Sequence, residues 1–65
     1  MGKYRVSFNL TTGEMNAEHF DGTEEELNVV KVDDYSVYTV WVEAANKKHA
    51  KVIGTRLINS YMKYE

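Results

Sequence analysis

Cysteine is absent from this chain of 65 residues, and its absence excludes both a disulfide framework and a metal site built from thiolates. Long hydrophobic runs are absent as well, so the sequence shows neither a signal peptide nor a segment able to span a membrane. We therefore expect a soluble, cytoplasmic protein. A chain this short forms one domain, residues 1–65, and buries only about 60% of its unfolded surface. We expect a thin core that depends on good packing or on a partner.

No group of residues has the spacing of a catalytic, cofactor or metal site. His19 and His49 lie far apart in the sequence, and a zinc site would have to recruit carboxylates such as Glu18 or Asp21. The acidic run at residues 24–26 is typical of a solvated turn, whereas acid-base catalysis needs a cleft that shifts one carboxyl pKa. Phosphate-binding loops and nucleophile elbows are also absent. We therefore predict a protein that is not an enzyme and uses no cofactor, metal or small-molecule substrate.

The charges are distributed unevenly along the chain, although the formal net charge is only −2. The carboxylates of the acidic middle are Glu14, Glu18, Asp21, Glu24, Glu25, Glu26, Asp33 and Asp34. The cations of the C-terminal part, which has no carboxylate between Ala44 and Tyr64, are Lys47, Lys48, Lys51, Arg56 and Lys63. The simplest interpretation is two neighbouring elements with solvated faces whose opposite charges attract. The alternative is that one of these regions is a docking surface.

The first third of the chain predicts a β-hairpin. Residues 4–10 alternate between apolar and polar side chains, which indicates a strand with one face on the core. The turn residues Thr11, Thr12 and Gly13 follow, and Gly13 is able to adopt a positive φ. We expect the chain to return as a shorter, more polar strand over residues 14–20.

Local signals disagree between residues 21 and 34. Thr23 and Glu26 fit a capping box, which favours a helical turn. The β-branched run after Asn28 favours a strand instead, because it is too short for a stable helix before the turn signal of Asp33 and Asp34. We predict a turn and then a third strand over residues 27–32, with a helical turn within 24–32 as the alternative. A tight hairpin then leads into a fourth strand, residues 35–43.

From Ala44 the hydrophobic period changes, which predicts an amphipathic helix of about 18 residues, roughly 27 Å long. Its apolar stripe consists of Ala50, Ile53, Gly54, Leu57, Ile58, Tyr61 and Met62. Gly54 is unfavourable inside a helix by about 1 kcal/mol relative to Ala, and we expect it to permit a close approach to the sheet. The predicted fold is α+β, a small antiparallel sheet of three or four strands in β-β-β-β-α order with one C-terminal amphipathic helix packed on one face. The predicted core contains Val6, Phe8, Val40, Ile53 and Leu57.

The predicted fourth strand is apolar on both faces. One face carries Tyr38, Val40 and Val42, and the other carries Tyr35, Val37 and Trp41. One helix covers only one face, so the second is either closed by curvature of the sheet around Trp41 or covered by a partner. In the second case Tyr35, Val37 and Trp41 form a protein interface, with another protein or with a second copy in a homodimer.

The basic helix is a second candidate surface. Lys47, Lys48, Lys51 and Arg56 are placed to contact a phosphate backbone, and aromatic residues on an open sheet face can stack on bases. The acidic middle and the negative net charge oppose this interpretation, because nonspecific affinity for nucleic acid comes mainly from neutralised phosphates. Nucleic acid is therefore possible as a partner but ranks below protein.

The segment VWVEAANKKHAKVIG has a pattern shared by unrelated small proteins, in which a strand ending in Glu-Ala runs directly into a helix. In its size, its lack of Cys and Pro and its lack of a catalytic site, the chain resembles the accessory proteins that phages and mobile elements encode to bind host proteins. This resemblance in type implies a small non-catalytic protein-binding module, an inhibitor or modulator of a larger partner. The alternative is a small nucleic-acid-binding module that uses the basic C-terminal helix.

Overall fold

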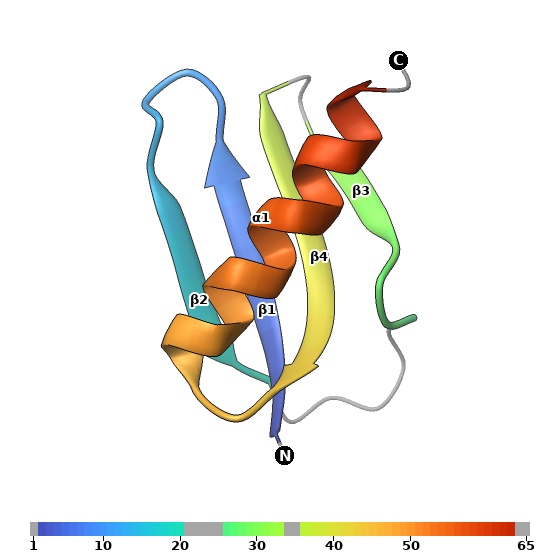
Figure 1. The fold of residues 1–65 in the computed structure, drawn as a ribbon. Helices are drawn as coiled ribbons and strands as arrows, with labels where there is room; N and C mark the ends of the chain where they lie inside the picture. Colours follow the sequence, from blue (N-terminus) through green and yellow to red (C-terminus); the bar gives the residue numbers. More distant parts are fainter. Residues whose placement is uncertain (1, 21–25, 34–35, 64–65) are drawn as a thin grey trace.

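Four strands and one helix make up the computed structural model, which describes residues 2–20, 26–33 and 36–63. The strands are β1 (Gly2–Asn9), β2 (Met15–His19), β3 (Val30–Asp33) and β4 (Val37–Ala44), and the helix is α1 (Lys47–Lys63). The strands form one antiparallel sheet, and α1 crosses one of its faces diagonally (Figure 1). The predicted α+β class, the β-β-β-β-α order and the C-terminal helix are confirmed, with four strands.

The sheet has the order β2-β1-β4-β3, so the two longest strands are central. β1 and β4 are paired along their whole length, from Gly2 opposite Ala44 to Asn9 opposite Val37. Val6 lies opposite Val40 on β4 and opposite Ala17 on β2, which places these three side chains on the same face. The central position of β4 explains why it is the most apolar strand of the chain.

The turn between β1 and β2 has the predicted chemistry. The side-chain Oδ1 of Asn9 accepts hydrogen bonds from the backbone N–H groups of Thr11 and Thr12, at 2.9 and 3.2 Å. Gly13 has a φ of 78°, in the left-handed region that favours glycine, and its N–H donates to the carbonyl of Asn9. The expected positive φ at Gly13 is therefore confirmed.

β3 is shorter than predicted and begins later. Leu27 makes only an isolated bridge to Trp41, and Asn28 then adopts a φ of 66°, which a short polar side chain tolerates better than a β-branched one. This turn interrupts the strand predicted for residues 27–32 and delays regular pairing with β4 until Val30. Thr23 of the predicted capping box, like Asp34 and Tyr35 of the predicted hairpin, lies outside the described residues.

α1 begins at a cap that the periodicity did not indicate. The side-chain Oδ1 of Asn46 accepts a hydrogen bond from the backbone N–H of His49 at 2.9 Å, and the Nδ1 of His49 accepts one from the N–H of Ala45 at 3.2 Å. The two side chains together satisfy backbone donors on both sides of the helix start, in the manner of a capping box with His in place of Glu. This cap separates β4 from α1 within two residues.

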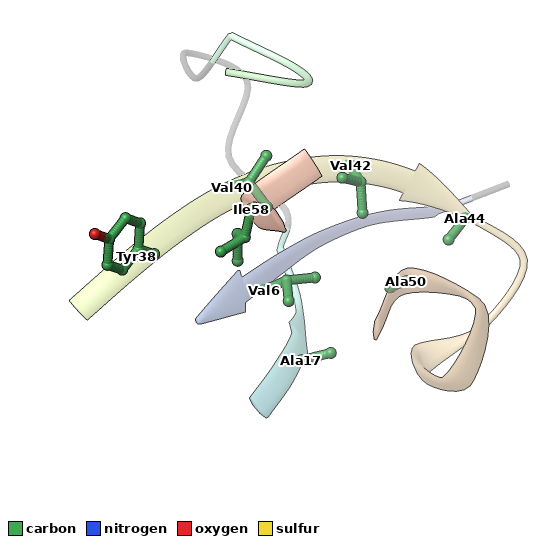
Figure 2. Packing of buried hydrophobic residues seen from close by; sticks show 8 residues of the cluster. All are labelled: Val6, Ala17, Tyr38, Val40, Val42, Ala44, Ala50 and Ile58. Carbon is green, nitrogen blue, oxygen red and sulfur yellow. The ribbon is translucent and has the colours of Figure 1, made fainter. Parts of the chain in front are cut away.

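The core lies between the sheet and α1 and is small. The buried hydrophobic residues are Val6, Ala17, Tyr38, Val40, Val42, Ala44, Ala50 and Ile58 (Figure 2). Of the five predicted core residues, Val6 and Val40 are fully buried, whereas Phe8, Ile53 and Leu57 are only partly buried against this cluster. The predicted core is therefore confirmed for Val6 and Val40 and only in part for the other three. Ile53 and Leu57 lie at its margin because the buried line of α1 runs through Ala50, Gly54 and Ile58.

Gly54 lies directly over β1. A Cβ atom at this position would stand 2.6 Å from Cγ1 and 2.8 Å from Cβ of Val6, closer than carbon atoms approach without a clash. The predicted close approach of the helix at Gly54 is therefore confirmed. It sets how near α1 lies to the centre of the sheet.

Candidate functional site

The face of the sheet opposite α1 carries the sequence-predicted residues Val37 and Trp41. Side chains alternate along β4, so Val37, Thr39 and Trp41 point away from the buried face of Tyr38, Val40 and Val42. Val37 and Trp41 are both partly buried. Tyr35, the third predicted interface residue, lies outside the described residues.

Trp41 is in contact with residues that the sequence patterns did not connect to it. Its ring meets that of Phe20 edge to face, with the centroids 5.9 Å apart at 67°. The ammonium Nζ of Lys31 lies 5.5 Å from the centroid of the indole ring, within the range of a cation–π interaction. The backbone N–H of Asn28 donates to the carbonyl of Trp41 at 2.7 Å. The chain itself therefore shields part of the indole, from the end of β2 and from β3.

The indole Nε1 of Trp41 is buried and has no hydrogen-bond acceptor among the described residues. A buried N–H group without an acceptor reduces stability by about 1 to 3 kcal/mol, and buried Trp N–H groups usually have a partner. The N–H group is turned into the fold, and only the remainder of the partly buried indole is accessible on this face.

The rest of this face is polar and carries charges of both signs. Thr39, only 7% exposed, separates Val37 from Trp41. Arg5 lies opposite Trp41 in the register and forms an exposed ion pair with Glu18 at 2.9 Å. The other ionisable side chains placed on this face by the register are Lys3, Lys31, Asp33 and Glu43. The apolar part of the face is therefore narrow, and opposite charges adjoin one another around it.

The four cations predicted as the alternative nucleic-acid surface are all exposed on α1, but they do not form one surface. Lys47 and Lys51 follow each other at i,i+4 and continue into Thr55, whose hydroxyl contacts the sulfur of Met15 on β2 at 3.2 Å. Helical geometry places Lys48 and Arg56 in a different row, with Val52 between them, on the side that faces away from the sheet. The sequence run of basic residues is thus divided between two sides of the helix.

Neither a metal centre nor a membrane-spanning helix is found in the described part of the chain. No group of three or more His, Cys, Asp or Glu side chains in residues 2–20, 26–33 and 36–63 has the arrangement to hold a metal ion. Within the same residues, no helix is both long enough and apolar enough to cross a bilayer. Comparison with protein-family models, with curated proteins and with solved structures gave no match to this chain.

Proposed function

We propose that this chain is a small, non-catalytic protein-binding module that acts as a homodimer, with the sheet face opposite α1 as the contact between the two copies. The observation that carries the proposal is the position of Trp41, a large aromatic side chain that is only partly buried on the face that the helix does not cover. Tryptophan is over-represented among the residues that dominate binding energy.

The charge pattern of the face supports a second copy as the occupant. Lys3 lies opposite Glu43, and Arg5 is paired with Glu18, so no part of the described face carries a block of one sign. Two such faces have no block of like charge to repel each other, and a suitably placed two-fold axis allows the cations of one copy to meet the carboxylates of the other. The narrow apolar centre at Val37 and Trp41 favours a modest affinity, of about micromolar Kd.

Val37→Asp tests this contact by placing a carboxylate at the edge of the apolar centre. We expect the variant to remain folded by far-UV circular dichroism and to sediment as a monomer at concentrations where the parent is a dimer, with the dimer weakened about tenfold or more. Val52→Asp is the matched control, because Val52 is 49% exposed on α1, on the other side of the molecule, and the same substitution there should leave the dimer unchanged.

Trp41→Ser provides a second variant at the centre of the same face. A folded, monomeric variant supports the proposal. A parent that is strictly monomeric across the concentration range, with Trp41 fluorescence shielded from an added quencher, contradicts it. That result would assign Trp41 to the stabilisation of the monomer through its contacts with Phe20 and Lys31.

A further inference from the structure

We infer that the side of α1 that faces away from the sheet binds an acidic segment of a partner protein. This outer row consists of Lys48, Val52, Arg56, Asn59 and Lys63, all of them exposed. The inference goes beyond the proposed dimer and concerns the opposite surface of the molecule. Dimerisation through the uncovered sheet faces leaves the outer row of each copy accessible.

The cations of α1 form no ion pair with another side chain among the described residues. The helix contains no carboxylate at all, and the one ion pair of the described residues joins Arg5 to Glu18, away from the helix. Lys31 on β3 is likewise engaged with the Trp41 ring. Arg5 and Lys31 of the sheet are therefore engaged in internal contacts, whereas the cations of the outer row are exposed. Their unpaired positive charge is complementary to carboxylates from outside the chain.

Helix stability does not explain the presence of these cations. Lys47 and Lys48 occupy the first turn of α1, where no acidic residue is present. Positive charges at this end oppose the helix dipole, which favours carboxylates there and cations only at the C-terminal end. Lys63 alone has the position that the dipole favours. The placement of Lys48 is thus unfavourable for the isolated fold and favourable for an anionic partner.

Val52 gives the outer row an apolar centre between two cations. It is one of the most exposed large hydrophobic residues among those described, at 49%, and it lies one turn from Lys48 and one turn from Arg56. These two cations are eight helical positions apart, about 12 Å along the axis. A complementary segment has two carboxylates about 12 Å apart with an apolar side chain between them. The pattern Glu-x-x-x-Leu-x-x-x-Glu provides this arrangement on one side of a helix.

A phosphate backbone fits this row less well. Nucleic acid offers a continuous line of charge but no apolar side chain to cover Val52. The chain also has a net charge of −2 in spite of its basic helix, which disfavours a long polyanion. An acidic protein segment satisfies both the charges and the exposed valine.

The test is to titrate the isotopically labelled full chain with a synthetic helical peptide that contains Glu-Ala-Gln-Ala-Leu-Ala-Gln-Ala-Glu. Binding is monitored through the NMR signals of the backbone amides. We expect saturable shifts confined to α1 around Lys48, Val52 and Arg56. Lys48→Glu and Arg56→Glu should each weaken binding about tenfold, because an attraction becomes a repulsion. Val52→Ser should weaken it about fivefold, as should a peptide with Ser in place of Leu.

Lys47→Glu is the matched control, because it changes the net charge by the same amount on the same helix but outside the outer row, and it should leave the peptide affinity within about twofold. Equal losses in Lys47→Glu and Lys48→Glu would overturn the inference in favour of nonspecific attraction. Mixed-sequence duplex DNA that binds more tightly than the peptide and loses affinity steeply between about 50 and 200 mM salt would also overturn it. Repeating the titration with Val37→Asp, which alters the sheet face and leaves the outer row intact, separates these outcomes from failure of the proposed dimer.

Discussion

At the scale of single residues, the close approach of α1 to the sheet depends on Gly54, which has no side chain. Gly54 lies within van der Waals distance of Val6, so the glycine is required by packing although it is unfavourable for the helix. Trp41 on β4 is the second such residue. Its ring contacts Phe20 and Lys31, and its Nε1 has no acceptor among the described residues. Gly54 is thus required for packing within the monomer, and Trp41 is the basis of the proposed dimer contact.

We expect Gly54→Ala to destabilise the protein even though alanine is the better helix former. The gain in helix propensity, about 1 kcal/mol, is smaller than the cost of forcing a methyl group into contact with Val6, so that we expect a net loss of about 1 to 2 kcal/mol in the free energy of unfolding. Urea unfolding measures this loss. Combining the change with Val6→Ala, which removes two of the three nearest atoms, should reduce the penalty of Gly54→Ala. A Gly54→Ala variant more stable than the parent would show that the helix moves away from β1 without cost.

At the scale of elements, the passage from β4 to α1 depends on the cap formed by Asn46 and His49. Strand β4 ends at Ala44 and the helix begins at Lys47, so the chain has only two residues in which to change its direction and its hydrogen-bonding pattern. The first backbone N–H groups of a helix have no partner within it, and Asn46 supplies one of the missing acceptors, to the N–H of His49. The side chain of His49 in turn accepts from the N–H of Ala45 in the connection.

We expect Asn46→Ala to lower the free energy of unfolding by about 1 kcal/mol, the usual effect of removing a capping side chain. Asn59→Ala is the matched control, because it is the same substitution at an exposed position within the helix, where alanine should be neutral or slightly stabilising. Thermal unfolding of both variants gives the comparison. Equal stability of the two would mean that the hydrogen bond from the His49 N–H contributes nothing to the start of α1.

At the scale of the whole molecule, one layer of buried side chains holds the helix against the sheet. A chain of this size has a total stability of roughly 3 to 10 kcal/mol, so a single large cavity removes much of it. The described charges are also segregated, with cations on the helix and both signs on the sheet face. The two faces of the molecule therefore present different chemistry to partners.

We expect Ile58→Ala to destabilise the molecule more than Leu57→Ala, although the two residues are adjacent and lose similar side-chain volume. Ile58 is only 1% exposed and Leu57 is partly buried, so Ile58→Ala leaves the larger cavity, with a loss of about 3 to 5 kcal/mol against about 1 to 2 for Leu57→Ala. Circular dichroism and melting temperature distinguish a largely unfolded variant from a merely weakened one. The opposite ranking would place Leu57, not Ile58, at the centre of the helix contact.

The sequence by itself determined the class of fold, because its periodicities are local: alternation over residues 4–10, turn chemistry ending at Gly13 and a helical stripe after Ala44. It also singled out Gly54 and the uncovered second face of β4, since one helix covers one face. The tertiary structure alone decided the sheet order β2-β1-β4-β3, the approach of Phe20 and Lys31 to Trp41, and the division of the basic residues between two sides of α1. These features depend on the pairing of segments far apart in the chain and on the exact rotation of the helix, which a single sequence does not encode as a local pattern.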